Sequence, residues 1–237
     1  MNGSGHTALA YRLPRFLRNH VLHFEASIEA AVESFSLQLP PGARVLDAGA
    51  GESRHAPLFA KQQYVSVDLA VGDAAWNYRK LDCIADLAAL PFASGAFDAL
   101  INIVTLEHLP DPARAMNEMA RVLRPGGRVL IAAPHEWEVH QSPHDYFRYT
   151  RHGLEHLLST AGFAEIEIKP AGGYFRLLSR RLLNGLQFFV GGPRWLLFLP
   201  AVALLVPPAL LLPALDGLDR DKNFTLGYLC TAKRSSH

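Results

Sequence analysis

Two glycines with one alanine between them directly follow a short apolar run that ends in an acid. This stretch, residues 45–51, reads VLDAGAG, and a helix-compatible segment comes after it. Because glycine has no Cβ, a strand-to-helix turn of this kind lets backbone N–H groups approach a ligand closely. Glycine pairs also occur in ordinary turns, so the spacing alone leaves ligand binding and simple chain reversal open.

A second apolar run, residues 64–68, ends in Asp68, which lies 21 residues after Asp47. In a doubly wound sheet, an acid at this carboxyl edge can hydrogen-bond a ribose hydroxyl. A dinucleotide fingerprint would have a glycine at the sixth position of Gly-x-Gly-x-x-Gly, where this chain has Arg54. Asp47, in front of the glycines, suits an ammonium or sulfonium better than a pyrophosphate. The pattern therefore favours a nucleoside ligand with a cationic end over NAD.

Together with three further motifs, these residues resemble the class I S-adenosylmethionine-dependent methyltransferases, specifically the type 11 small-molecule group. The resemblance covers about residues 40–172. It is carried by VLDAGAGES at 45–53, the strand-end Asp68, ADLAALPF at 85–92, FD at 97–98 leading to LEH at 106–108, and LRPGG at 123–127. One position departs from the pattern, because Ser53 stands where the family often has a third glycine.

The resemblance implies S-adenosylmethionine as cofactor and names the residues that would hold it. Asp47 would complement the methionyl ammonium, directly or through water. Asp68 would accept from the ribose hydroxyls, and Asp86 from the exocyclic amine of the adenine. An acid such as Asp86 is also common as a cap or turn residue, which is the alternative. The remaining cofactor-binding residues expected are Gly49, Ala50, Gly51, Leu69, Leu87 and Asn102.

Residues 134–150 are rich in histidine, acidic and aromatic side chains, and they follow a predicted strand at the edge where open α/β sheets bind ligands. The histidines at 135, 140 and 144 lack the spacing of a recognisable metal pair, and Pro143 interrupts the last two. We therefore expect no metal and predict a polar, aromatic acceptor pocket. For a hydroxyl acceptor, His144 is the first candidate base and His108 the second, with a structural role as the alternative for each. An enolate or thiolate acceptor would need no base.

Composition and charge narrow the class of protein further. A chain of 237 residues with 49% hydrophobic content can bury one substantial core. A net charge of +1 argues against a broad electrostatic contact with nucleic acid. Cys83 and Cys230 lie in strand-like apolar runs, where we expect reduced core residues. The first residues lack a basic-then-apolar signal pattern, which favours a cytoplasmic protein.

Alternating strand and helix signals predict an α/β fold. The expected architecture is a doubly wound, mainly parallel seven-stranded sheet with helices on both faces, Rossmann-like, plus an apolar helical insertion before the last strand. A leading amphipathic helix over 20–39 is expected to cap the sheet, with closure over the cofactor as the alternative. The predicted division is a helical cap at 1–40, the cofactor-binding core at 41–173, the insertion at 174–221, and the last strand with its tail at 222–237.

The insertion contains a charge-free run of 21 residues, 195–215. One helix of this length would span roughly 30 Å, enough for a bilayer core. Four prolines interrupt it, however, and a single crossing would separate the last strand from its sheet. We favour a hairpin, 182–215, that dips into the membrane, with arginines at 176, 180, 181 and 194 suited to an anionic leaflet. A buried lid or homodimer contact, and a true span, are the alternatives.

These features predict a cytoplasmic S-adenosylmethionine-dependent methyltransferase at the inner face of the cell membrane, acting on a small-molecule, lipid or lipid-linked acceptor. Methyl transfer is an in-line displacement, so alignment in a dry pocket is the enzyme's main task. Peripheral or monotopic membrane contact is the expected association, without nucleic acid. The alternative from another class is a non-catalytic, membrane-tethered partner protein that retains the fold, although the acids at 47, 68 and 86 count against it. A nicotinamide oxidoreductase is disfavoured by Arg54.

Overall fold

The computed structural model describes residues 20–72 and 75–236, which fall into two compact units. The core unit consists of Ile28–Lys169 with Tyr228–His237. The hairpin unit consists of Met1–Ser27 with Pro170–Gly227, of which the described part begins at residue 20. The four-part division predicted from the sequence remains a proposal.

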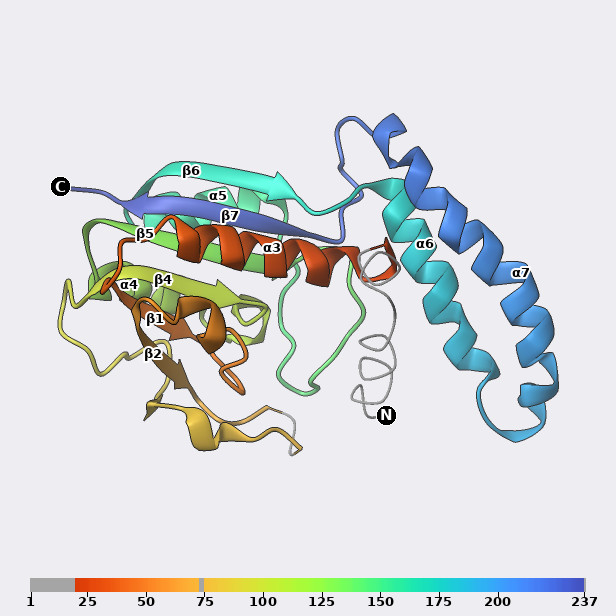
Figure 1. The fold of residues 1–237 in the computed structure, drawn as a ribbon, viewed down its shortest axis with the longest axis horizontal. Coiled ribbons are helices and arrows are strands. Elements are labelled where there is room, and N and C mark those ends of the chain that lie inside the picture. Colours follow the sequence, from red (N-terminus) through yellow and green to blue (C-terminus); the bar gives the residue numbers. More distant parts are fainter. Residues whose placement is uncertain (1–19, 73–74, 237) are drawn as a thin grey trace. The chain divides into compact units, whose positions relative to one another are not determined.

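A seven-stranded sheet forms the centre of the fold, in the order β3-β2-β1-β4-β5-β7-β6 (Figure 1). Strands β1 to β5 pair in parallel, whereas β6 and β7 run in opposite directions. The strands are β1 (Arg44–Ala48), β2 (Gln63–Asp68), β3 (Cys83–Ile84), β4 (Phe97–Ile103), β5 (Leu123–Pro134), β6 (Phe163–Pro170) and β7 (Gly227–Arg234). The predicted mainly parallel, doubly wound sheet is confirmed.

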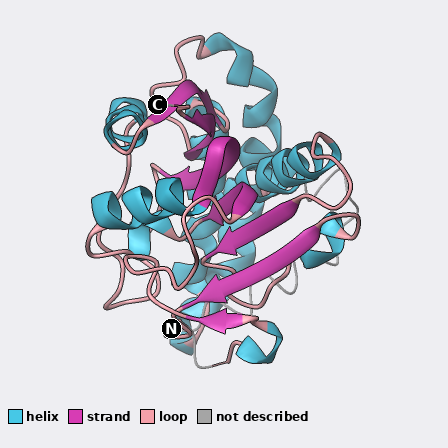
Figure 2. Cartoon of the chain, turned by 90° about the vertical axis from the view of Figure 1, so that its left-hand side faces the viewer, coloured by secondary structure: helices cyan, strands magenta, loops and turns pink. Residues whose placement is uncertain are grey.

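Helices cover both faces of the twisted sheet (Figure 2). Residues 28–37 of α3 lie over the face turned toward the viewer in Figure 1, and α4 and α5 lie behind it. The α-helices are α3 (His23–Leu37), α4 (Pro112–Val122), α5 (Arg151–Thr160), α6 (Tyr174–Gly185) and α7 (Phe198–Leu211). The 3-10 helices are η1 (Ala56–Phe59), η2 (Tyr78–Lys80), η3 (Leu106–His108), η4 (Leu186–Phe189), η5 (Gly192–Leu197) and η6 (Leu212–Leu218).

The central strands are apolar on both faces because helices bury both. In β4, every residue from Ala99 to Ile103 is buried, and all but Asn102 are apolar. Met116 and Met119 of α4 pack into the same core and are fully buried. Asp111 begins α4 by accepting a hydrogen bond from the Arg114 amide at 3.0 Å. This rigid layer fixes the strand ends at which the site is built.

The segment after the glycine turn differs from the expected helix. Residues 51–55 form turns, and only the short η1 follows. Ser53 has a left-handed backbone, with φ of +56°, which interrupts any α-helix at this point. Pro57 lies in the first turn of η1 and cannot donate a backbone hydrogen bond. Strand β5 begins at Leu123 and includes the LRPGG motif, residues 123–127, where its pairing with β4 shifts register.

In the hairpin unit, α6 and α7 lie side by side and run in opposite directions (Figure 1). Ser179 Oγ of α6 donates to the carbonyl of Ala209 in α7 at 2.5 Å. Asp216 accepts from the amide of Gly173, just before α6, and from the amide of Arg176, both at 3.1 Å. The described residues include one helical stretch, Gly192–Leu218, with the length and composition of a membrane span. The predicted apolar helical insertion before the last strand is thus present.

Candidate active site

The glycine turn after β1 has a backbone that depends on glycine. Gly49 has φ of +89° and Gly51 has φ of +53°. A Cβ on Gly49 would lie 2.3 Å from Cγ2 of Thr105, which follows β4. The Thr105 hydroxyl donates to the Gly49 carbonyl at 3.2 Å. The turn is therefore packed against the end of β4, at the point where the strand order reverses and open α/β sheets bind their ligands.

Asp68, at the end of β2, is tied to this turn. Its Oδ2 accepts from the Gly51 amide at 2.9 Å, and its Oδ1 accepts from the Ala70 amide at 2.8 Å. Each carboxylate oxygen retains a lone pair, because a carboxylate offers about four acceptor positions. The neighbouring Leu69 is exposed at the same strand end. The structure thus brings together Asp68 and the glycine turn, as the strand-end spacing predicts.

Asp47 is a buried acid with one unused oxygen. Its Oδ2 accepts from the Tyr64 hydroxyl, while Oδ1 has no hydrogen-bond partner among the described residues. Burial raises the pKa of Asp47 to about 7, since a charged carboxylate is poorly solvated there. On the neighbouring strand, Asn102 Nδ2 donates to the Ala48 carbonyl at 2.7 Å, and Asn102 Oδ1 is also buried without a partner in the described part of the chain. Two unused acceptors at the ends of β1 and β4 favour a ligand with donors or positive charge.

Asp86 and Leu87 follow β3, beside Asp68. The amide of Ala85 donates to the Asp68 carbonyl at 3.0 Å, which places this segment at the same edge. Asp86 is exposed, and its Oδ1 accepts from the Ala88 amide at 2.8 Å. This is the turn role considered from the sequence, and it leaves Oδ2 for a ligand. The Leu87 side chain is buried in the core, so its backbone is the part that faces the edge.

An aromatic loop that carried no predicted role lies over the glycine turn. A Cβ on Gly51 would be 3.5 Å from the Trp76 ring, and the Asn77 amide donates to Glu52 Oε1 at 2.9 Å. Trp76 also packs edge-on against Tyr78. A flat apolar ring beside a nucleoside site is a suitable surface for the cofactor. The sequence shows the aromatic side chain of Trp76, but the spacing between Trp76 and the glycines matches no recognisable motif.

The loop after β5 is fastened to η3. Tyr149 Oη donates to the Leu106 carbonyl at 2.9 Å, and the Tyr146 amide donates to the Glu107 carbonyl at 2.9 Å. Inside the loop, Arg148 makes a two-pronged ion pair with Asp145, at 2.6 and 2.8 Å. Although burial opposes the charged form, the Arg148 guanidinium and the His140 amide hold the pKa of Asp145 at about 2. The loop is therefore an ordered wall next to the strand ends.

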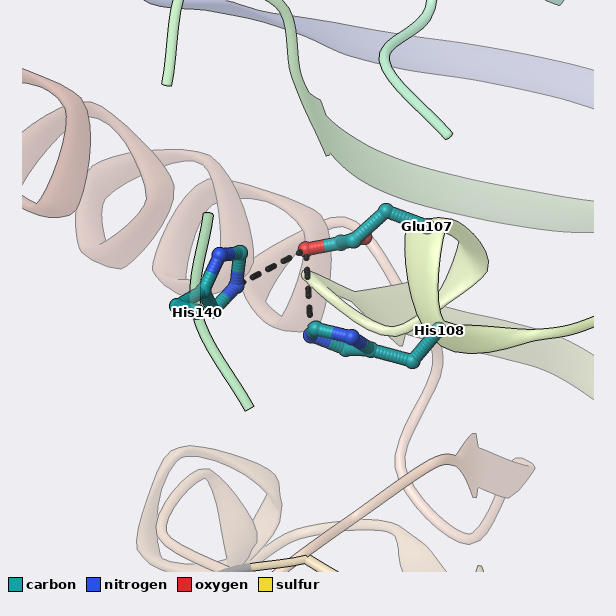
Figure 3. A group of neighbouring side chains, drawn as sticks. All are labelled: Glu107, His108 and His140. Atoms are coloured by element: carbon teal, nitrogen blue, oxygen red, sulfur yellow. Dashed lines mark ion pairs between the residues drawn. The ribbon is translucent and has the colours of Figure 1, made fainter. Parts of the chain in front are cut away.

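The two candidate bases occupy different environments in this wall. His144 is exposed, with Nδ1 3.1 Å from the Tyr146 hydroxyl. His108 Nδ1 lies 2.6 Å from the His144 carbonyl, and its Nε2 faces Glu107 at 3.6 Å. His140 reaches the same Glu107 oxygen from the loop, at 3.7 Å (Figure 3). The sequence pattern does not reveal this last contact, because the two segments meet only in the fold.

Three features together define a class I S-adenosylmethionine-dependent methyltransferase fold. They are the strand order, the acid–Gly-x-Gly turn at the switch point, and the acids Asp68 and Asp86 at the ends of the next two strands. Residues 46–131 match a family model described as a methyltransferase domain. Residues 46–131 therefore form a methyltransferase domain of the type 11 group of class I S-adenosylmethionine-dependent methyltransferases. This confirms the family resemblance, whereas the roles of the individual residues stay predictions.

Known proteins resemble the chain over part of its length. A demethylmenaquinone methyltransferase of Mycobacterium marinum is 37% identical over 100 residues, which cover 40% of this chain and 43% of that protein. The chain thus spans less than half the length of this relative. Two solved structures share the fold. The [4+2]-cyclase SpnF has a TM-score of 0.57 at 21% identity, over 87% of this chain and 82% of its own. Haemonchus contortus phosphoethanolamine N-methyltransferase 2, in complex with S-adenosyl-L-methionine, has a TM-score of 0.54 at 18% identity. This match covers 89% of our chain and 53% of the methyltransferase chain.

S-adenosylmethionine is the cofactor of this family, and the described residues fit it. The unused Asp47 Oδ1 and Asn102 Oδ1 are buried acceptors at the switch point. Gly49 and Gly51 form a turn without side chains, and their amides are held by the Val67 carbonyl at 2.8 Å and by Asp68 Oδ2 at 2.9 Å. Asp68 retains acceptor positions at the strand end where a ribose is expected. Charge, hydrogen-bonding capacity and backbone geometry therefore suit a cationic nucleoside.

Proposed function

We propose that this protein transfers the methyl group of S-adenosylmethionine to a lipid or lipid-linked acceptor at a membrane surface. The observation that carries the proposal is the buried, half-unpartnered Asp47 carboxyl next to the Gly49–Gly51 turn. A positive charge placed there would favour its ionised form. A pyrophosphate would be repelled by that form.

The residues of the chain would bind and align rather than activate the cofactor, which itself supplies an electrophilic methyl group on a sulfonium. Asp47 would face the methionyl end, while Asp68 would accept from the ribose and Asp86 from the adenine. Trp76 would exclude water from the glycine turn. For a hydroxyl acceptor, His144 would take the proton, because its ring lies on the exposed side of the loop. Alignment of this kind is the main source of rate enhancement expected for an in-line displacement.

The proposed acceptor class follows from the hairpin unit and from the relative. Exposed apolar side chains gather on its 3-10 helices, on α7 and at Val190, which follows η4; those on the helices are Phe188, Trp195, Leu196, Leu197, Leu199, Leu204, Leu211 and Leu218. An apolar surface of this extent rarely stays in contact with water. The relative's name, demethylmenaquinone methyltransferase, indicates a lipid quinone as the acceptor of that protein. A lipid quinone, or another acceptor on an apolar tail, is therefore the class we propose here.

The arginines near the hairpin do not all favour an anionic leaflet. Arg176 pairs with Asp216 at 3.5 Å, and Arg180 pairs with Glu25 at 3.1 Å, both inside the hairpin unit. Arg194 lies exposed in η5, among the apolar side chains. The proposed membrane contact therefore depends mainly on apolar burial, with Arg194 at the tip as the cation best placed for a lipid phosphate.

Cofactor binding is tested by calorimetry with S-adenosylhomocysteine and with NAD. We expect S-adenosylhomocysteine to bind much more tightly than NAD. Asp68→Ala should weaken its binding by about 1–3 kcal/mol, the scale of hydrogen bonds lost at a buried polar group. Glu167→Ala, an acid on β6 that pairs with Lys169, is the matched control and should leave binding unchanged. Tight NAD binding without a response to S-adenosylhomocysteine would refute the cofactor assignment.

Membrane docking is tested by flotation with anionic vesicles. The wild type should float, and a variant with 182–215 replaced by a Gly/Ser linker should not. A less invasive variant places glutamate at Leu199 and Leu204, which are 71% and 73% exposed on α7. Leu37→Glu, at a residue 74% exposed on α3, is the control and should float like the wild type. If the wild type stays soluble, the apolar surface is a lid or a dimer contact.

A further inference from the structure

Glu107 is a fully buried carboxylate without a hydrogen-bond donor. Its side chain is 0% exposed, and neither of its oxygens has a hydrogen-bond partner among the described residues. The nitrogens that face it are Nε2 of His108, at 3.6 Å, and Nε2 of His140, at 3.7 Å, both from the same oxygen, Oε1 (Figure 3). These distances are too long for hydrogen bonds. Since buried charges are normally paired or bound to metal ions, a cation is the partner expected for Glu107.

The ring of His108 is oriented so that Nε2 presents a lone pair. Its Nδ1 lies 2.6 Å from the His144 carbonyl oxygen, which can only accept, so Nδ1 carries the proton. In the neutral ring Nε2 is then unprotonated. This nitrogen is buried and has no hydrogen-bond partner in the described part of the chain.

The ring of His140 is oriented in the same way. Its Nδ1 lies 3.1 Å from the Glu138 carbonyl oxygen and 3.4 Å from Asp145 Oδ2. Arg148 Nη2 is also 3.4 Å from this nitrogen, but it donates to the Glu138 carbonyl and to Asp145 Oδ2, each at 2.8 Å. In the neutral ring of His140, we therefore place the proton on Nδ1 and the lone pair on Nε2. A histidine that donates its second N–H to a carbonyl or carboxylate is the usual arrangement around protein-bound metals.

We propose that Glu107, His108 and His140 bind a divalent transition-metal ion through Oε1 and the two Nε2 atoms. The candidate ligand atoms all lie within 4.8 Å of one another. Bonds of about 2.0–2.2 Å in a tetrahedral site place ligand atoms about 3.3–3.6 Å apart, close to the separations from Oε1 given above. Two imidazoles and one carboxylate suit Zn²⁺, Fe²⁺, Mn²⁺ or Co²⁺ better than Mg²⁺ or Ca²⁺, which prefer oxygen ligands.

Three protein ligands leave at least one coordination position for water or a substrate oxygen, as in catalytic metal sites. The Glu107 side chain is 0% exposed, His108 is 11% exposed and His140 is 25% exposed, so the accessible side is that of His140. Because η3 follows Thr105, which contacts the glycine turn, an acceptor oxygen on the ion would lie at the ligand-binding edge of the sheet. The ion would orient and acidify such an oxygen. This use rests on the proposed function, whereas metal binding does not.

The experiment measures metal binding by the full chain without cofactor or acceptor. Protein without an affinity tag, stripped with a chelator, is titrated with Co²⁺ and Zn²⁺ by calorimetry, and the visible spectrum of bound Co²⁺ is recorded. We expect one equivalent per chain, a spectrum of four- or five-coordinate Co²⁺, and a metal-dependent rise in melting temperature. His108→Ala, His140→Ala and Glu107→Gln should each lower the affinity at least about tenfold. His156→Ala, at an exposed histidine on α5, is the control and should bind like the wild type.

Several results would overturn the proposal. One is a wild type that shows no saturable binding near one equivalent, which would mean that a proton on His140 satisfies Glu107 instead. Another is Glu107→Gln binding as tightly as the wild type, or His156→Ala losing as much affinity as His140→Ala. If Glu107→Gln does not fold by circular dichroism, the two alanine variants decide, because the side chains of His108 and His140 are more exposed than that of Glu107. Metal binding with no methyl transfer would refute only the proposed function.

Discussion

Replacing Asp47 by asparagine should stabilise the protein above neutral pH. The wild-type carboxyl is fully buried, and burial raises its pKa from 3.8 to about 7. Once the pH exceeds both pKa values, this difference destabilises the folded protein by about 4 kcal/mol. Asparagine carries no charge and retains an oxygen that can accept from the Tyr64 hydroxyl. The substitution thus removes most of this energetic penalty.

The pH window follows from the direction of the shift. Between pH 4 and pH 7 the folded protein keeps a proton on Asp47 that the unfolded chain has lost, so wild-type stability falls as pH rises. The Asp47 carboxyl lowers the free energy of unfolding by about 2 kcal/mol at pH 5 and by about 4 kcal/mol at pH 8. The stability difference between Asp47→Asn and the wild type should therefore grow by about 2–3 kcal/mol over this range. His23 and His55, whose pKa values burial lowers to about 4, titrate in both proteins and cancel from the difference.

Urea unfolding of both proteins at pH 5 and pH 8, followed by circular dichroism, measures this difference without bound cofactor. The slopes of the unfolding transitions should agree, so that the midpoints report stability. A stability difference that does not change with pH would refute the reasoning. In that case Asp47 would already be ionised in the free protein, and some other group would neutralise it.

Three further predictions concern the cofactor turn and the hairpin unit. S-adenosylmethionine should release close to one proton on binding at pH 6, measured by calorimetry in buffers of different ionisation enthalpy, and Asp47→Asn should abolish this release. Gly49→Ala should lose measurable S-adenosylhomocysteine binding and unfold more easily, because φ is +89° and the new Cβ would meet Thr105; normal binding would contradict the turn geometry. Asp216→Ala should destabilise the hairpin unit by about 1–3 kcal/mol, detected as faster proteolysis within 170–227, because the cap on Gly173 and Arg176 is lost. Unchanged proteolysis would show that α6 needs no cap.

Strand positions and the cofactor edge could be predicted because their signals are local. Apolar runs that end in Asp47 and Asp68 locate β1 and β2, and these strands pair in parallel although only the short η1 lies between them. Ser53 was visible as a departure from the family, but its left-handed backbone was not. Pro57 lies within the expected helix, where its missing N–H limits the segment to the short η1.

The acceptor wall was less predictable because its contacts are not local. The sequence spacing relates the histidines at 135, 140 and 144 only to one another, whereas His140 faces Glu107 and His108 from a different loop. No periodicity connects two loops that follow separate strands. Only the sheet order, which places β4 and β5 side by side, brings them together.

Methyl transfer to a lipid is measured most directly by following a labelled methyl group. The full chain is incubated with methyl-labelled S-adenosylmethionine and a membrane-lipid extract, and the lipid products are separated and identified. The account predicts label in a discrete lipid product, lowered about 5- to 150-fold by Asp68→Ala at limiting cofactor, as a loss of 1–3 kcal/mol implies, and unchanged by Glu167→Ala. Protein that binds the cofactor but labels no lipid, or an Asp68→Ala variant that labels as well as the wild type, would contradict it.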